Sequence, residues 1–405
     1  MTLFKIIFVN NKGQTQQNNM KKILFLSNML PNNLDAGGML YADILNNYGL
    51  EKFRFISLQY PLKEKYINLE ISKQIIEQYS FRIPGKNFFY KVMRKIPLLD
   101  TCYVFLNLLL YQRKIIELIN KENFDAIFAP LRGDVLLILP LILKKTSLPL
   151  YAMVEDTVEA EILDSNVLYK MKKKAYYDLL KSVVSLGVAG EAMREYFMAK
   201  FNLDSIILRP SHEKFSSTYP KIVNHEVNIF FAGNTYAERE LKAFIKALEI
   251  ASSKTSSAIS FYIASHKSYF SNSDKLTINN LGWLPQEELI AYMNKCHISY
   301  LPYRMEPKFK HQMMYAFPGK SGFYISHNLP VFFHGPAYSS FNAFLNYHAV
   351  GVSCDSLSPE IISAKIMDFL GNDSAYLKYQ DECRTAFHAK FSKEIFSKNA
   401  FDFLN

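Results

Sequence analysis

The residues with the clearest capacity for chemistry lie in one stretch of the second half, between Ser299 and Pro336. A short apolar run ends there at Pro302 and is followed by a polar, basic loop that contains Arg304 and Glu306. The chain then reads Phe317-Pro318-Gly319-Lys320, and such punctuation by Pro and Gly predicts a loop that enters a helix. A lysine at this junction lies where backbone N–H groups already favour an anion. The stretch therefore predicts a phosphate-binding site.

Acidic candidates follow a buried strand in the first half. The run from Leu148 to Val154 predicts a strand that delivers Glu155 and Asp156 at its carboxyl end, and Arg132 follows the preceding strand. In open α/β sheets ligands bind beyond the carboxyl ends of the strands, so these three residues are candidates for catalysis. A second interpretation stays open, in which Asp156 or Thr157 only caps the next helix.

Two series of alternating strands and helices must position these residues. The first series begins with the apolar run from Ile23 to Ser27, followed by Gly37-Gly38 at the opening of a helix that ends near Tyr48. The sixty residues after Leu58 are expected to be largely helical. The second series begins at Val227 to Phe231. The pattern predicts an α/β protein with two Rossmann-like, doubly wound domains that face a cleft.

Several motifs of the second half occur in the order that is typical of one enzyme group. They are Gly282-Trp283-Leu284-Pro285, Leu301-Pro302-Tyr303, Pro318-Gly319-Lys320 and Asn328-Leu329-Pro330-Val331. This order resembles the donor site of GT-B glycosyltransferases, which use nucleotide-sugars and mostly retain anomeric configuration. One position departs from the resemblance, because Phe323 stands where the family usually has a glutamate that holds the ribose hydroxyls.

The resemblance implies roles for individual residues. Lys320 and Arg304 would contact the donor diphosphate, with Glu306 at the sugar or ribose. The other donor-binding candidates lie at glycine-containing turns or in the helix that follows one of them, and they are Gly37, Gly38, Asn234, Arg239 and Gly319. Arg132, Glu155 and Asp156 would lie on the acceptor side. The resemblance implies a nucleotide-diphosphate sugar as substrate and no cofactor, and the histidine spacing in this region matches no metal site.

Four segments are predicted from the order of these patterns. Residues 1–19 are expected to be a disordered extension ahead of Met20, with Met1 as the alternative start. Residues 20–210 are expected to form the acceptor domain and residues 222–385 the donor domain. Residues 386–405 are expected to form a helix that crosses back to the first domain.

The amino-acid composition limits the classes of partner that we expect. Lys and Arg number 47 against 37 Asp and Glu, which gives a formal net charge of +10 and indicates anionic partners. No known basic-aromatic module is present, so nucleic acid is not expected. The four cysteines are scattered without a Cys-x-x-Cys spacing, which is typical of a reducing compartment, and we expect a cytoplasmic protein. No apolar run approaches the roughly 20 residues that span a bilayer.

A membrane surface is a further expected partner. The segment from Lys86 to Lys95 combines bases with aromatic residues, and an apolar helix is predicted from Leu98 to Asn120. Such a pair of helices could lie on the anionic inner face of a membrane, as a peripheral protein does. The alternative is a solvated helix packed on a core helix, and both interpretations stay open.

Together these patterns predict a glycosyltransferase of surface polysaccharide synthesis that acts on a glycan or lipid-linked acceptor, without a metal and with retention. Two alternatives share the fold. A nucleotide-sugar epimerase would need acid and base residues where an acceptor would bind, and a catalytically inactive partner protein would bind or turn over no donor. Turnover of nucleotide-sugars separates the inactive protein from the enzymes, and dependence on an acceptor separates transferase from epimerase.

Overall fold

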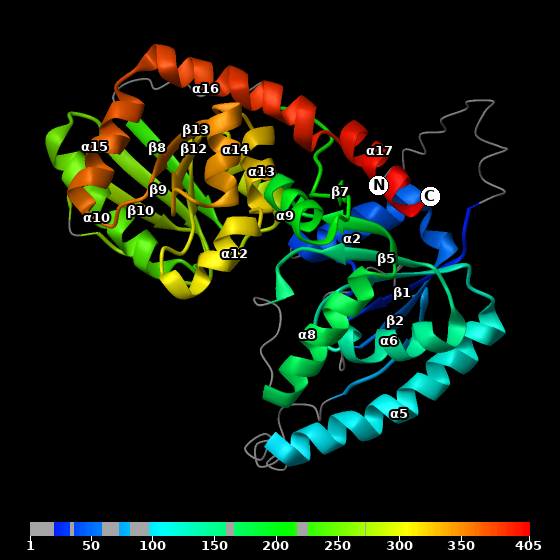
Figure 1. Ribbon diagram of the computed structural model, residues 1–405. Coiled ribbons are helices and arrows are strands. Elements are labelled where there is room, and N and C mark those ends of the chain that lie inside the picture. The colour runs from blue at the N-terminus through cyan, green and yellow to red at the C-terminus, as the bar shows by residue number, and fades with distance from the viewer. Residues whose placement is uncertain are drawn as a thin grey trace, which may run out of the picture.

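The computed structural model describes most of the chain as two parallel β-sheets with helices on both faces (Figure 1). The described residues are 20–32, 36–58, 73–81, 97–158, 166–216, 226–271 and 273–405. The predicted extension at residues 1–19 and the basic-aromatic segment at residues 86–95 lie outside them. The predicted fold class, α/β with two doubly wound units, is confirmed.

The first sheet has seven strands in the order β3-β2-β1-β4-β5-β6-β7, and every neighbouring pair is parallel. Its strands are β1 (Ile23–Ser27), β2 (Phe53–Ser57), β3 (Ile75–Gln78), β4 (Ala126–Pro130), β5 (Leu150–Val154), β6 (Val183–Val188) and β7 (Ile206–Ile207). Strands β1, β4 and β5 are buried along their whole length. Their continuous apolar sequences therefore fit a sheet covered on both faces.

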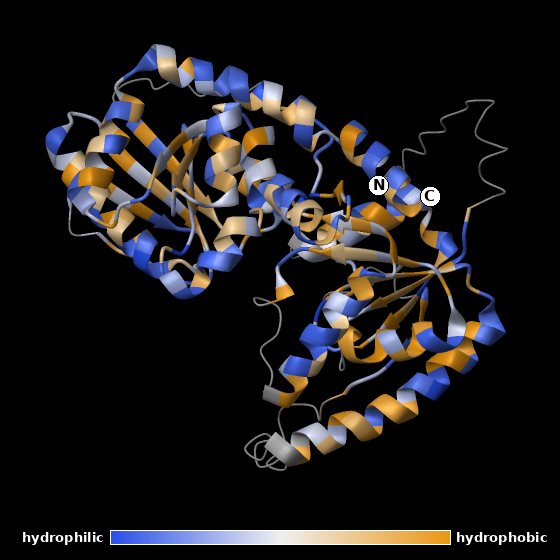
Figure 2. Ribbon diagram, in the orientation of Figure 1, coloured by the Kyte–Doolittle hydropathy of each residue, from blue (hydrophilic) through white to orange (hydrophobic). Residues whose placement is uncertain are grey.

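Helices from distant parts of the chain cover the first sheet. One face packs against α5 (Pro97–Glu122), α6 (Val135–Thr146), α8 (Asn166–Leu180) and α9 (Glu191–Phe201). The other face packs against α2 (Ala36–Tyr48) and α17 (Lys393–Leu404). Figure 2 shows the strands of the first sheet mostly in orange, and helices in which orange stretches alternate with blue and white ones.

The second sheet has six parallel strands in the order β10-β9-β8-β11-β12-β13. They are β8 (Glu226–Ala232), β9 (Ala258–Ala264), β10 (Leu276–Asn280), β11 (Ile298–Pro302), β12 (Val331–His334) and β13 (Gly351–Cys354). Helices α10 (Glu238–Lys254) and α15 (Pro359–Leu370) cover one face. The opposite face carries α11 (Gln286–Met293), α12 (Lys310–Tyr315), α13 (Lys320–Ser326) and α14 (Ser340–His348).

The C-terminal segment joins the two sheets. Helix α16 (Asp373–Ala386) packs on the second sheet and continues through a π-helical turn, Phe387–Phe391, into α17. Helix α17 buries Phe403 and Leu404 in the core of the first sheet, against α2. The red end of the chain in Figure 1 therefore lies on the half that the N-terminal strands build.

Two sequence-based assignments need correction. The sixty residues after Leu58 were expected to be largely helical, but β3 lies among them as the edge strand of the first sheet. The polar loop after Pro302 contains a 3-10 turn, Pro307–Phe309, and the short helix α12. All three elements are short and only partly buried, so none produces a long apolar run that sequence alone could reveal.

Candidate active site

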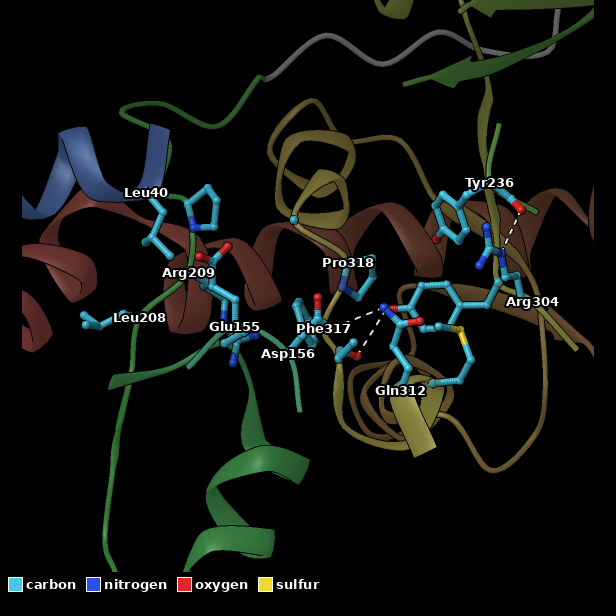
Figure 3. Close-up of a pocket in the computed structure, with 16 residues that line it drawn as sticks. Leu40, Glu155, Asp156, Leu208, Arg209, Tyr236, Arg304, Gln312, Phe317 and Pro318 are labelled. Carbon is cyan, nitrogen blue, oxygen red and sulfur yellow. Dashed lines mark hydrogen bonds between the residues drawn. The ribbon is translucent and has the colours of Figure 1, made fainter. Parts of the chain in front are cut away.

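A cavity of about 360 Å³ lies where the two halves of the chain meet (Figure 3). The first half contributes residues from α2 and from the carboxyl ends of β5, β6 and β7, namely Leu40, Glu155, Asp156, Ala189, Leu208, Arg209 and Pro210. The second half contributes residues that follow β8 and β11 or lie around α12, namely Tyr236, Tyr303, Arg304, Gln312, Met313, Ala316, Phe317, Pro318 and Gly319. The cavity therefore lies at the edge where ligands bind in parallel α/β sheets.

Glu155 is held at this edge by residues from two neighbouring elements. Its Oε1 atom lies 3.5 Å from Nη1 of Arg132, and the hydroxyl of Tyr41 donates a hydrogen bond to the same oxygen. A Cβ atom on Gly37 would lie 2.9 Å from Oε2 of Glu155. Because that spacing is too short for a side chain, Gly37 permits α2 to approach the carboxylate. The structure thus brings Gly37, which was expected on the donor side, together with Arg132 and Glu155, which were expected on the acceptor side.

Asp156 lies beside Glu155 and reaches toward the other half of the molecule. Nε2 of Gln312, on α12, donates to Oδ1 of Asp156 at 3.5 Å. Next to it, Oγ1 of Thr157 lies 3.0 Å from Nδ1 of His311. Burial raises the pKa of the Asp156 carboxyl above its ordinary 3.8, and Gln312 and the charge of Arg132 oppose this rise. A carboxyl of this kind at a cavity wall is a candidate for proton transfer.

The alternative role of Asp156 or Thr157 as a helix cap concerns the segment that follows them. Residues 159–165 lie outside the described part of the chain, so that alternative stays open.

Lys320 lies at the carboxyl end of β8, at the start of α13. Its Nζ atom donates to the carbonyl oxygen of Ala232 at 2.9 Å and lies 4.6 Å from the ring centroid of Phe231. A Cβ atom on Gly233 would lie 3.1 Å from this Nζ, and the φ angle of Gly233 is +112°. Burial lowers the pKa of the Lys320 amine to about 8. A side chain at position 233 would therefore crowd the amine, and glycine leaves room for it.

Arg304 is fixed by the loop that follows β11. Its Nε atom donates to the carbonyl oxygen of Tyr236 at 2.8 Å, and its guanidinium carbon lies 4.1 Å from the ring centroid of Phe309. The next backbone N–H, that of Met305, donates to Oε1 of Glu240 at 2.9 Å. Glu240 is 2% exposed, so a buried carboxylate anchors the loop that carries Arg304.

Other predicted residues lie away from the cavity wall. Asn234 and Arg239 are exposed on the turn after β8 and on the first turn of α10, and Glu306 precedes the 3-10 turn. A Cβ atom on Gly38 would lie 2.1 Å from Nδ2 of Asn32, so this glycine is needed for packing against Asn32. Gly319 does line the cavity.

Phe323, at the position where the resemblance expects an acid, packs against two histidines. Its ring centroid lies 4.7 Å from that of His327 and 5.7 Å from that of His212. Helix α13 ends at Ser326, and Asn328 two residues later adopts a left-handed φ of 57°, a conformation that asparagine tolerates at helix ends.

Sequence reasoning missed three residues of the site. Arg209 lay at the end of the predicted acceptor domain, Gln312 in a predicted loop, and Glu240 in the first turn of a helix, where an acid commonly complements the helix dipole.

No group of three or more His, Cys, Asp or Glu side chains among the described residues is arranged to hold a metal ion. None of their helices combines the length and apolar character needed to cross a membrane.

Comparison with known proteins finds similarity at the level of structure. No family model and no curated protein sequence matches the chain. The solved structure of WaaG, a glycosyltransferase involved in lipopolysaccharide biosynthesis, aligns with a TM-score of 0.60 at 10% identity and covers 94% of this chain and 99% of its own. The α,α-trehalose 6-phosphate synthase from Burkholderia multivorans gives 0.60 at 8%, over 95% and 96%.

A third similar structure is that of a plant protein. Phytolacca americana UGT2, solved with UDP-2-fluoro-glucose and pterostilbene, gives a TM-score of 0.53 at 10% identity, over 94% of this chain and 99% of its own. These likenesses extend over nearly the whole of both chains. They show a shared two-sheet architecture.

Proposed function

We propose that this chain, which has the GT-B fold, is a glycosyltransferase that moves a sugar from a nucleotide-diphosphate sugar to a glycan or lipid-linked acceptor. The observation that carries the proposal is the distribution of charge around the cavity. Arg304, which follows β11, lines the cavity, and Lys320 directly follows the lining residue Gly319, whereas the lining residues Glu155 and Asp156 follow β5 of the first sheet. Cations on one side suit the donor diphosphate, and carboxylates on the other suit an acceptor hydroxyl.

The donor side would act by stabilising the leaving diphosphate. Negative charge builds on that group as the glycosidic bond to it breaks, and fixed cations in a site of low dielectric stabilise such charge. The Lys320 amine is already held by the Ala232 carbonyl, and Arg304 is held by Tyr236, so neither side chain needs to be ordered by the substrate. We propose that these two cations perform this task without a metal ion.

The acceptor side would orient and activate a hydroxyl group. Asp156 lies at the cavity wall, and Gln312 from the opposite half contacts its carboxyl. We propose that Asp156 accepts a hydrogen bond from the attacking hydroxyl, and that Glu155 and Arg132 position the acceptor. Retention of anomeric configuration is proposed from the sequence resemblance alone.

Participation in surface polysaccharide synthesis at the inner face of a membrane is part of the proposal. Helix α5 supports it, because Leu106, Leu109 and Leu110 are 58 to 64% exposed on one face and are followed by exposed Arg113 and Lys114. Figure 2 shows long orange stretches along this helix. Apolar side chains beside bases are the combination that binds an anionic lipid surface.

Replacing Leu106, Leu109 and Leu110 together by Gln is expected to weaken binding to vesicles that contain phosphatidylserine by at least about tenfold, because each leucine loses the gain from burial in the lipid. Cosedimentation measures the effect. The control is Leu377→Gln, an equally exposed leucine on α16. Equal binding by the triple variant and the wild type would show that α5 does not contact the membrane.

The function is tested with a panel of UDP-, GDP- and CMP-sugars, assayed for nucleotide release with and without an acceptor glycan. We expect slow release from one donor alone and faster release with an acceptor. Conversion of the sugar without an acceptor would favour the epimerase. Absence of binding and turnover with every donor would favour the inactive partner protein.

A further inference from the structure

Arg209 is a buried cation at the cavity wall that the proposed donor chemistry does not use. It follows β7, at the point where the chain leaves the first sheet, and it is only 5% exposed. Its guanidinium carbon lies 4.2 Å from the ring centroid of Phe317, with Phe391 at 5.5 Å. Figure 3 draws it among the residues that line the cavity. A charged group in such apolar surroundings calls for an explanation, because burial opposes its charge.

The hydrogen bonds of this guanidinium are incomplete. Nη2 donates to Oε2 of Glu191 at 2.7 Å. Nε and Nη1 find no hydrogen-bond partner among the residues that the structure describes. An arginine carries five N–H donors, and leaving buried donors unsatisfied is costly. Oxygen atoms of a ligand at this wall would satisfy them.

The surroundings of Arg209 favour an anion. Helix α9 begins beside it, and no side chain of the described residues caps this helix at Gly190, which has an extended backbone. The N-terminus of an eleven-residue helix such as α9 carries partial positive charge. Glu191 is shared between two cations, because its Oε1 lies 3.4 Å from Nζ of Lys390. The side chains of Arg209 and Lys390 and the N-terminus of α9 thus carry positive charge beside a single carboxylate, that of Glu191.

We propose that Arg209 and the first turn of α9 bind an anionic group, a phosphate or a carboxylate, of the acceptor substrate. This inference rests on the proposed function and names the chemical class of its acceptor. Arg209 and α9 belong to the first half of the chain, which holds Glu155 and Asp156, whereas Lys320 and Arg304 belong to the second. The acceptor anion and the donor diphosphate therefore have separate cations. The two unsatisfied donors of Arg209 and the planar fork of its guanidinium suit a bidentate contact with two ligand oxygens.

The test uses inorganic phosphate as the probe and calorimetry as the measurement, with the full-length protein. We expect the wild type to bind phosphate both alone and with the donor nucleotide at saturation. Arg209→Gln is expected to weaken phosphate binding by about 10- to 100-fold, because charge-assisted hydrogen bonds are lost. Arg194→Gln is the matched control, since Arg194 lies on α9 in an exposed ion pair with Asp204.

A second variant distinguishes a loss of phosphate binding from a loss of folded protein. Arg209→Lys keeps the charge beside Glu191 but lacks the planar fork, so it is expected to remain folded and to bind phosphate more weakly than the wild type. If Arg209 only joins the two halves of the chain, both Arg209 variants would lower the melting temperature and leave phosphate affinity unchanged. That result would overturn the inference.

Competition between phosphate and the donor nucleotide shows whether the anion at Arg209 belongs to the donor or to the acceptor. Phosphate that is displaced one for one by the nucleotide would assign Arg209 to the donor diphosphate, and the acceptor assignment would be wrong. Phosphate binding at Arg209 in a protein that binds no nucleotide-sugar would overturn the proposed donor site and leave this one standing.

Discussion

Replacing Asp156 by Asn is expected to lower kcat by about 100- to 10,000-fold, the range over which a positioned acid or base contributes to a reaction. The amide retains the shape of the side chain and can still meet Gln312, but it cannot take a proton from an acceptor hydroxyl. The affinity for the nucleotide-sugar is expected to remain within about twofold of the wild-type value, because donor binding is assigned to the other half. Initial rates and equilibrium binding, measured on the same protein, check both statements.

The dependence of the wild-type rate on pH gives a second test of the role of the Asp156 carboxyl. Because burial raises the pKa of Asp156, the acidic fall in rate should lie above the ordinary aspartate pKa of 3.8 and should disappear in Asp156→Asn. Asp178→Asn, in an exposed ion pair with Lys181, is the control. A kcat that Asp156→Asn leaves unchanged would remove this residue from the chemistry.

Donor affinity is expected to weaken as the pH rises through about 8, where the buried Lys320 amine loses its proton. The pKa in the folded protein lies below the ordinary value of 10.5, so the cation predominates at neutral pH and is lost above pH 8. The diphosphate of a nucleotide-sugar does not titrate in this range. With one essential cation, the dissociation constant should rise about tenfold between pH 7 and pH 9.

Two substitutions identify the group that titrates. Lys320→Arg should bind the donor with little dependence on pH, because a guanidinium stays protonated throughout. Lys320→Ala should lose affinity at all pH values, by about 10-fold or more. Lys242→Ala, in an exposed ion pair with Glu238, is the control. A donor affinity that stays constant from pH 7 to pH 9 in the wild type would contradict the assigned role of Lys320.

The buried strands could be predicted from sequence because their apolar runs report burial on both faces. β1, β5 and β8 match the predicted runs to within a residue or two, and β11 ends at Pro302 as predicted. The strands missed are β3 and β10, which lie at the edges of their sheets. An edge strand has a neighbour on one side only, and the sequences of both include residues that remain partly or fully exposed.

The site could be predicted where its residues follow a strand directly, and less well elsewhere. Glu155, Asp156 and Arg304 come at or near the ends of buried strands, so strand prediction places them at the cavity edge. Gln312 and Arg209 reach the site through the packing of the two halves, which no local pattern encodes. The same holds for Glu240, whose carboxylate accepts a bond from the backbone of a loop 65 residues away.

The role of Phe323 illustrates a limit of motif matching. The motif predicts where the side chain lies on α13, but the partners of the ring, His327 and His212, come from the end of that helix and from the linker. The phenylalanine therefore packs on the second half and on the segment that connects the two halves. We propose that Glu306 makes the ribose contact that the resemblance assigns to an acid at this position.

Thermal stabilisation by a panel of nucleotide-sugars tests the central claim most directly, because it needs neither the acceptor nor turnover. We expect one donor to stabilise the wild type by about 2.7 kcal/mol at 100 times its dissociation constant. Lys320→Ala at the same donor concentration should lose most of this gain, whereas Lys242→Ala should keep it. Two results would contradict a nucleotide-sugar site where Lys320 meets the turn at Gly233. They are no stabilisation by any donor, and equal stabilisation of the wild type and Lys320→Ala.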